Sequence, residues 1–158
     1  MRLGACTAET HLVSKPRLAV PPRPKTPLSA GFLDDRIRSV QRIFWYGVTV
    51  FILLLAAYTY SLYAGYFFIY WWWDIPMHIA GGILAGLIGM WAAAFSGGRP
   101  SIVAALAGAC ILGIGVEVVE YALGFTYSPW MSYPVDTLKD IINDVIGAVL
   151  IGYVIVRS

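Results

Sequence analysis

Seven side chains that can ligate a metal ion or exchange protons lie within the apolar part of the chain. They are Asp74, His78, Glu117, Glu120, Asp136, Asp140 and Asp144. They form three groups, Asp-x3-His, Glu-x2-Glu and Asp-x3-Asp-x3-Asp, and residues three or four apart share one face of a helix. Carboxylate oxygens favour Mg²⁺, Ca²⁺ or Mn²⁺, and an added imidazole favours zinc or iron. The sequence therefore predicts a site for a divalent metal ion.

The seven residues divide into two expected roles. The expected metal ligands are Asp74, His78, Glu117, Asp140 and Asp144. Glu120 and Asp136 are the expected catalytic residues, and either would serve as a general base toward water.

Some of these residues also have a simpler interpretation. Asp74 and Asp136 stand near expected helix starts, where an aspartate caps the N-terminus or is favoured by the helix dipole. His78 on its own is more typical of a hydrogen-bonded interior histidine. Glu117 and Glu120 are harder to explain in this way, because they lie far from a helix N-terminus and their own helix carries no cation.

The composition indicates the elements that must position these groups. Apolar residues make up 59% of the 158 residues and the mean hydropathy is +0.71, which indicates an integral membrane protein. A helix needs about 20 apolar residues to cross a bilayer, and four segments meet that need. Their short connections predict antiparallel neighbours, and so an all-α, integral membrane four-helix bundle. The expected spans are 43–67, 75–95, 102–123 and 135–156.

The distribution of cations predicts how the bundle crosses the membrane. Eight of the eleven Lys and Arg residues lie at or before Arg42, so we expect the N-terminus to be cytoplasmic. Residues 1–35 are basic and proline-rich and are expected to form a disordered tail, with the transmembrane domain covering 36–158. Arg99 and Arg157 then fall on the cytoplasmic side as well, which gives an N-in, C-in topology.

All six acids of the membrane part would then lie in the outer leaflet. A lone charge deep in the bilayer costs at least about 2.5–3.5 kcal/mol, and only Lys139 and His78 are near enough to pair with these acids. Glycine and alanine continue the same helix faces, which favours close helix packing. We therefore expect spans two, three and four to turn their polar faces toward one another. The first span has no acid, Lys, Arg or His between Ile43 and Phe68 and is expected to pack outside them.

Several other functions are not predicted. The basic residues are concentrated in the tail, so nucleic acid is not an expected partner. Cys6 and Cys110 have no metal-ligand spacing and are not expected to form a disulfide. The chain contains no phosphate-binding loop, dinucleotide fingerprint or nucleophile elbow.

The order of the three polar groups resembles that of the small bacterial VanZ-like and YjdF-like membrane proteins. Glu120 stands where the VanZ-like pattern has Gln, and Asp144 stands where it has Asn, whereas "DTLKD" at 136–140 is more similar to the YjdF-like pattern. The outer-loop Arg of VanZ-like proteins has no counterpart between Gly124 and Pro134. The resemblance covers roughly residues 43–156 and implies a multi-pass protein of the bacterial plasma membrane, but little of its mechanism.

Three functions are compatible with these residues. The first is a metal-dependent enzyme acting on a lipid or lipid-linked substrate at the outer leaflet, which makes membrane lipid the expected partner. The second is a structural or partner-binding membrane protein, in which the acids form a polar network between helices. The third is a cation or proton transporter, but the inner halves of spans two to four contain no ionisable group for a continuous path.

Overall fold

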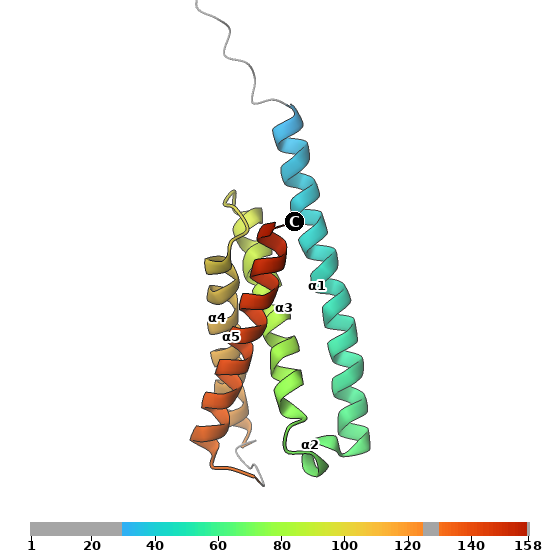
Figure 1. Cartoon of the computed structure of the whole chain (residues 1–158), viewed down its shortest axis with the longest axis vertical. Coiled ribbons are helices and arrows are strands. Elements are labelled where there is room, and N and C mark those ends of the chain that lie inside the picture. The colour runs from blue at the N-terminus through green and yellow to red at the C-terminus, as the bar shows by residue number, and fades with distance from the viewer. Residues whose placement is uncertain (1–29, 125–129, 158) are drawn as a thin grey trace, which may run out of the picture.

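The computed structural model describes residues 30–124 and 130–157, in which every secondary-structure element is a helix (Figure 1). The helices are α1 (Ala30–Ala64), α2 (Tyr66–Ile69), α3 (Asp74–Phe95), α4 (Ile102–Leu123) and α5 (Tyr133–Arg157). The all-α prediction is confirmed. The bounds of α3 and α4 agree with the expected second and third spans to within one residue.

Three helices, α1 from Asp34, α3 and α4, are long and apolar enough to cross a membrane. Many of their large apolar side chains are exposed, including Leu53, Val103 and Ile111, as expected of helices that face lipid. These observations support the prediction of a membrane protein. Helix α5 is as long, but four of its first 12 residues are charged, and it is not among the helices that are apolar enough to cross a membrane by this measure. The fourth span and the N-in, C-in topology stay predictions.

Helix α1 begins earlier than the sequence predicted. Residues 30–35, which we expected in the disordered tail, are helical, and residues 1–29 lie outside the described part of the chain. An ion pair between Arg38 and Asp34, one turn apart, supports this extension. Arg36 Nη2 also donates to the carbonyl oxygens of Ala94 and Phe95, which end α3 (3.2 and 3.3 Å).

Local sequence explains where α1 ends and where α4 begins and ends. Gly65 has a φ of 71° and Gly124 a φ of 79°, a left-handed conformation that glycine adopts readily and that closes α1 and α4. Ser101 caps the start of α4, because its side chain accepts a hydrogen bond from the Ala104 amide (3.1 Å).

Helix α3 lies at the centre of the packing and contacts α1, α4 and α5. Helices α4 and α5 also pack on each other, whereas α1 packs mainly on α3, along one side of the group (Figure 1). These contacts agree with the expected arrangement, in which the last three long helices face one another and the first lies outside them, while the four-helix membrane bundle stays a prediction. In the described part of the chain, the largest fully buried apolar side chains are Ile43, Leu87 and Met90.

Glycines allow α3 to approach two of its neighbours, α4 and α5, at backbone distance. A Cβ atom on Gly89 would overlap the Ala104 carbonyl oxygen of α4, and one on Gly108 would overlap the Ala85 carbonyl oxygen of α3. Gly82 stands in the same relation to the backbone of α5. This close approach is what small residues achieve between membrane helices, and it determines how far side chains must reach across each interface.

Candidate functional site

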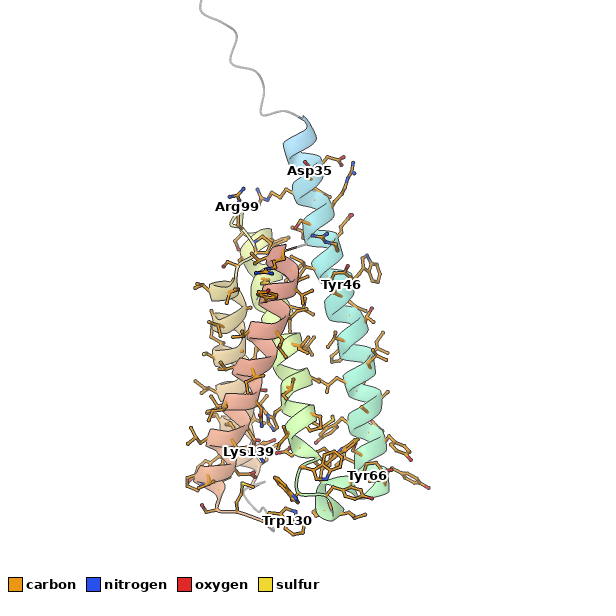
Figure 2. The ribbon with its side chains drawn as sticks, in the orientation of Figure 1. Asp35, Tyr46, Tyr66, Arg99, Trp130 and Lys139 are labelled. Atoms are coloured by element: carbon orange, nitrogen blue, oxygen red, sulfur yellow. The ribbon has the colours of Figure 1, made fainter. Side chains whose placement is uncertain are left out.

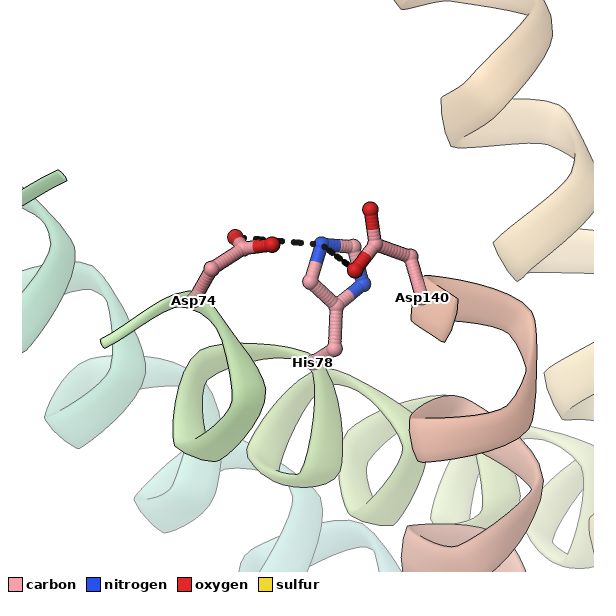
Figure 3. Close-up of side chains that lie close together, drawn as sticks. All are labelled: Asp74, His78 and Asp140. Atoms are coloured by element: carbon pink, nitrogen blue, oxygen red, sulfur yellow. Dashed lines mark ion pairs between the residues drawn. The ribbon is translucent and has the colours of Figure 1, made fainter. Parts of the chain in front are cut away.

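Four of the predicted site residues converge at one end of α3 and α5. His78 lies between the others: its Nε2 is 3.4 Å from Asp74 Oδ1 and 3.6 Å from Asp140 Oδ1, and its Nδ1 is 3.5 Å from Asp144 Oδ1 (Figure 3 shows the first two contacts). Asp74 and His78 are one turn apart on α3, and Asp140 and Asp144 are one turn apart on α5, so two helix faces suffice to bring the four together.

Asp74, His78 and Asp140 each offer one ligand atom, and these three atoms lie within 4.8 Å of one another. Two ligands bound to one divalent ion at about 2.0–2.6 Å are separated by at most about 5 Å, so this spacing fits a single ion. Asp140 is only 4% exposed, and its Oδ1 makes no hydrogen bond to the described residues. A buried anionic oxygen of this kind is stabilised by a cation.

Lys139 provides one such cation, although its place in the sequence indicated only that it lies near the acids. Its Nζ donates to Asp74 Oδ2 (2.8 Å) and Asp136 Oδ1 (2.6 Å) and lies 3.2 Å from Asp140 Oδ1. One lysine therefore contacts three of the six acids. The spacing of three residues predicts the contact between Lys139 and Asp136 within one helix. The contact to Asp74 could not be predicted in this way, because it depends on the distance between α3 and α5. Figure 2 places Lys139 at the end of the molecule away from Asp35 and Arg99.

Asp74 and Asp136 do not act as N-caps. Helix α3 begins at Asp74 with Trp73 in the cap position, and no side chain there makes a capping hydrogen bond. Asp136 lies inside the first turn of α5. Both carboxylates contact Lys139 instead, although their place near helix N-termini also suits the helix dipole.

Glu117 lies apart from the three ligand atoms that fit one ion. It is buried, at 7% exposed, and its Oε2 accepts a hydrogen bond from Thr137 Oγ1 of α5 (2.7 Å). Tyr133, also on α5, donates through its hydroxyl to the Glu117 backbone carbonyl (3.1 Å). Glu117 therefore connects α4 to α5. Thr137 was not singled out from the sequence, since threonine is common in membrane helices, and Tyr133 was expected only as part of an aromatic belt at the outer membrane surface.

Small residues leave room for Asp144 between α3 and α4. A Cβ atom on Gly113 would lie 2.6 Å from Asp144 Oδ2, which is closer than a carbon atom can approach without a shift of its neighbour. A Cβ atom on Gly81 would lie 3.6 Å from Asp144 Oδ1, in ordinary van der Waals contact. The two glycines thus form the walls beside this carboxylate. The stripes of small residues seen in the sequence have this local role as well as their role in helix packing.

A cavity of about 580 Å³ extends from the cluster into the apolar part of the molecule. Asp74, His78, Glu120 and Asp144 line its polar end. Among the described residues Glu120 forms no ion pair with Lys, Arg or His within 4.0 Å, although it faces the same space as His78. The predicted catalytic residues therefore differ in setting, because Asp136 is held by Lys139 and Glu120 faces the cavity.

The chain matches no protein-family model, no curated protein and no solved structure. What the site does must therefore be inferred from its own residues and geometry.

Proposed function

We propose that the chain is a multi-pass protein of the bacterial plasma membrane whose outer-leaflet site binds a divalent metal ion and acts on a lipid or lipid-linked substrate. The observation that carries the proposal is that two members of the Asp74–His78–Asp140 group, Asp74 and His78, line the polar end of an apolar cavity. A lipid is the substrate class that such a cavity suits, since its apolar part is buried in the protein and its polar part reaches the ligating atoms.

The donor set suits a divalent ion even with Lys139 in place. Lys139 bonds Asp74 through Oδ2, which leaves Asp74 Oδ1 facing His78. Asp140 Oδ1 also faces His78 Nε2, with Lys139 Nζ 3.2 Å away, whereas Asp144 Oδ1 faces Nδ1 on the other side of the ring. We propose Asp74, His78 and Asp140 as the ligands of one ion, with Asp144 orienting the imidazole through Nδ1. A bound ion would supply Lewis-acid polarisation of a carbonyl or phosphoryl oxygen.

Glu120 is the better supported of the two proposed bases. A general base must reach the proton that it removes, and Glu120 lines the cavity in which a substrate would lie. Asp136 does not line this cavity, and its Oδ1 accepts a hydrogen bond from the Lys139 ammonium. We therefore assign proton transfer to Glu120 and the positioning of Lys139 to Asp136.

A second function is favoured by Lys139 itself. Its contact to Asp74 joins α5 to α3, its contact to Asp136 lies within α5, and the Thr137–Glu117 hydrogen bond joins α5 to α4. A polar network of this kind can specify how helices associate without any catalysis. No comparable observation favours transport. A second cavity of about 260 Å³ lies between α1 and α3, but it is lined by apolar residues and glycine and so offers no ionisable group to an ion path.

The resemblance to VanZ-like and YjdF-like proteins is part of the proposal and rests on the order of the polar groups along the chain. It is compatible with the convergence of the first and third of those groups, which lie on α3 and α5. It adds the bacterial plasma membrane as the location.

The metal proposal is tested by binding, independently of activity. Purified full-length protein, stripped with a chelator and reconstituted in lipid nanodiscs, is titrated with Mg²⁺, Mn²⁺, Ca²⁺ and Zn²⁺, followed by metal analysis after gel filtration. We expect one ion per chain, and at least tenfold weaker binding in Asp140→Asn. Asp35→Asn is the matched control, because Asp35 is exposed at the opposite end of the molecule. The absence of stoichiometric metal from the wild type would refute the proposal and leave the structural network as the function.

A further inference from the structure

The cavity is long enough to hold a lipid chain of one leaflet. On α3 its lining extends from Asp74 to Ile88, 14 residue steps or about 21 Å at 1.5 Å per residue. The hydrocarbon core of a bilayer is about 30 Å thick, so one leaflet accounts for about 15 Å. Helices α1 and α2 form one wall, α3 the base and α4 the other wall, and away from the polar end the lining is almost wholly apolar.

The volume fits a chain better than a helix of a partner protein. About 580 Å³ lies within the range of roughly 300–1,000 Å³ that single small ligands occupy. A helix is at least about 10 Å across with its side chains, so 21 Å of helix would need about 1,600 Å³. A partner helix is therefore too large for this cavity, whereas one extended hydrocarbon chain is not.

The helix packing leaves a route into the cavity from the side. Helices α1 and α4 both line it, yet α1 packs mainly on α3, and α1 and α4 are not a packed pair. In a membrane, the space between α1 and α4 faces lipid. A chain can enter there without leaving the hydrocarbon region, and no water-filled path is needed.

The polar end selects for the head group. The carboxylates of Asp74, Glu120 and Asp144 line this end together with His78. Such a surface binds groups that donate hydrogen bonds, such as hydroxyl or ammonium groups, and repels an anionic group that is not neutralised by a cation.

We propose that the cavity binds one apolar chain of a membrane lipid, which enters sideways between α1 and α4 and places a hydroxyl- or ammonium-bearing head beside His78. The head-group part rests on the proposed function of the same site. The chain part does not depend on a metal. The lipid is bound from within the bilayer, so the chain is held along α3 while the head meets the carboxylates.

The test uses phosphatidylethanolamine with a photoactivatable diazirine in the middle of one acyl chain. The full-length protein is reconstituted in nanodiscs containing a trace of this probe, illuminated and digested, and the labelled residues are identified. We expect labelling of Leu84, Leu112 and Val116, which line the cavity, to exceed labelling of Val118 and Val119, which face outward. Equal labelling of all five positions would show bulk lipid only and overturn the proposal.

Two substitutions separate the cavity from the surrounding lipid. Val116→Trp fills the cavity and should reduce labelling of Leu84 and Leu112 at least fivefold. Val118→Trp makes the same change two residues away, at a position that does not line the cavity, and should leave that labelling unchanged. Thermal unfolding of both variants checks that they fold, and Leu84→Phe is a milder filling variant if Val116→Trp does not. Undiminished labelling in a folded filled variant would refute the proposal.

The chain proposal and the metal proposal can fail separately. Asp140→Asn should lose metal but keep the labelling of Leu84, because Asp140 does not line the cavity. Val116→Trp should keep stoichiometric metal but lose that labelling. If the metal titration fails while the labelling pattern holds, the cavity remains a lipid-binding site without a metal-dependent reaction.

Discussion

Replacing Lys139 with Met should lower stability and raise metal affinity at the same time. The substitution keeps the apolar stem and removes the charge that contacts Asp74, Asp136 and Asp140. Removal of one partner from a buried ion pair costs about 3–5 kcal/mol. The side chains of Lys139 and Asp74 are 20% and 28% exposed, so we expect the lower end, about 3 kcal/mol. That value lowers the folding equilibrium constant by roughly a hundredfold.

A divalent ion should largely reverse this loss. With Lys139 absent, no ammonium competes with the ion for the carboxylates of Asp74, Asp136 and Asp140. The affinity of the site for the ion should therefore increase. An ion present at a hundred times its dissociation constant stabilises the folded state by about 2.7 kcal/mol, which is close to the expected loss. The assay is reversible unfolding by dodecyl sulfate in mixed micelles, with chelator and with metal.

The control is Arg38→Met, which removes a mostly exposed pair with Asp34. Exposed pairs contribute about 0–1 kcal/mol, so this variant should unfold almost as the wild type does. If Lys139→Met also unfolds like the wild type in chelator, the three contacts of Lys139 do not stabilise the protein. If it is destabilised and no ion restores it, the carboxylates do not form a metal site.

Three further substitutions, one of them with a matched control, test the packing and the cavities. Gly89→Ala should destabilise the protein by at least about 1–3 kcal/mol in the same unfolding assay, because its Cβ meets α4 backbone, whereas Gly115→Ala, with open space, should not. Gly113→Ala should displace the Asp144 carboxylate and weaken metal binding about tenfold in the titration, while the protein stays folded. Gly47→Phe fills open space in the second cavity, between α1 and α3. If this variant loses photolabelling by probes with longer acyl chains but keeps labelling by shorter ones, the second cavity holds the end of the chain.

Helix periodicity explains the part of the site that could be predicted. Asp74 with His78, and Asp140 with Asp144, share faces because of backbone geometry alone, and the stripes of small residues indicated which faces pack together. The same reasoning placed α1 outside the other long helices, since it has no acid, Lys, Arg or His between Ile43 and its end.

The roles of Glu117 and Lys139 could not be predicted in this way. Both depend on reach between helices rather than on spacing within one helix. Gly82 brings the backbones of α3 and α5 into contact, which allows the Lys139 side chain to span to Asp74. Thr137 similarly meets Glu117 from α5. These distances depend on packing, and a pattern of residue types along one chain does not contain them.

The central position of α3 has a consequence for the order in which the protein is made. His78 and Asp74 are synthesised with α3, but Lys139 and Asp140 follow about 60 residues later, on α5. A ribosome that has produced only α1 to α4 has therefore left an acid and an imidazole at the end of α3 without these partners. The last helix completes the cluster, so truncated chains that lack α5 should be substrates for membrane quality-control proteases rather than partly active proteins.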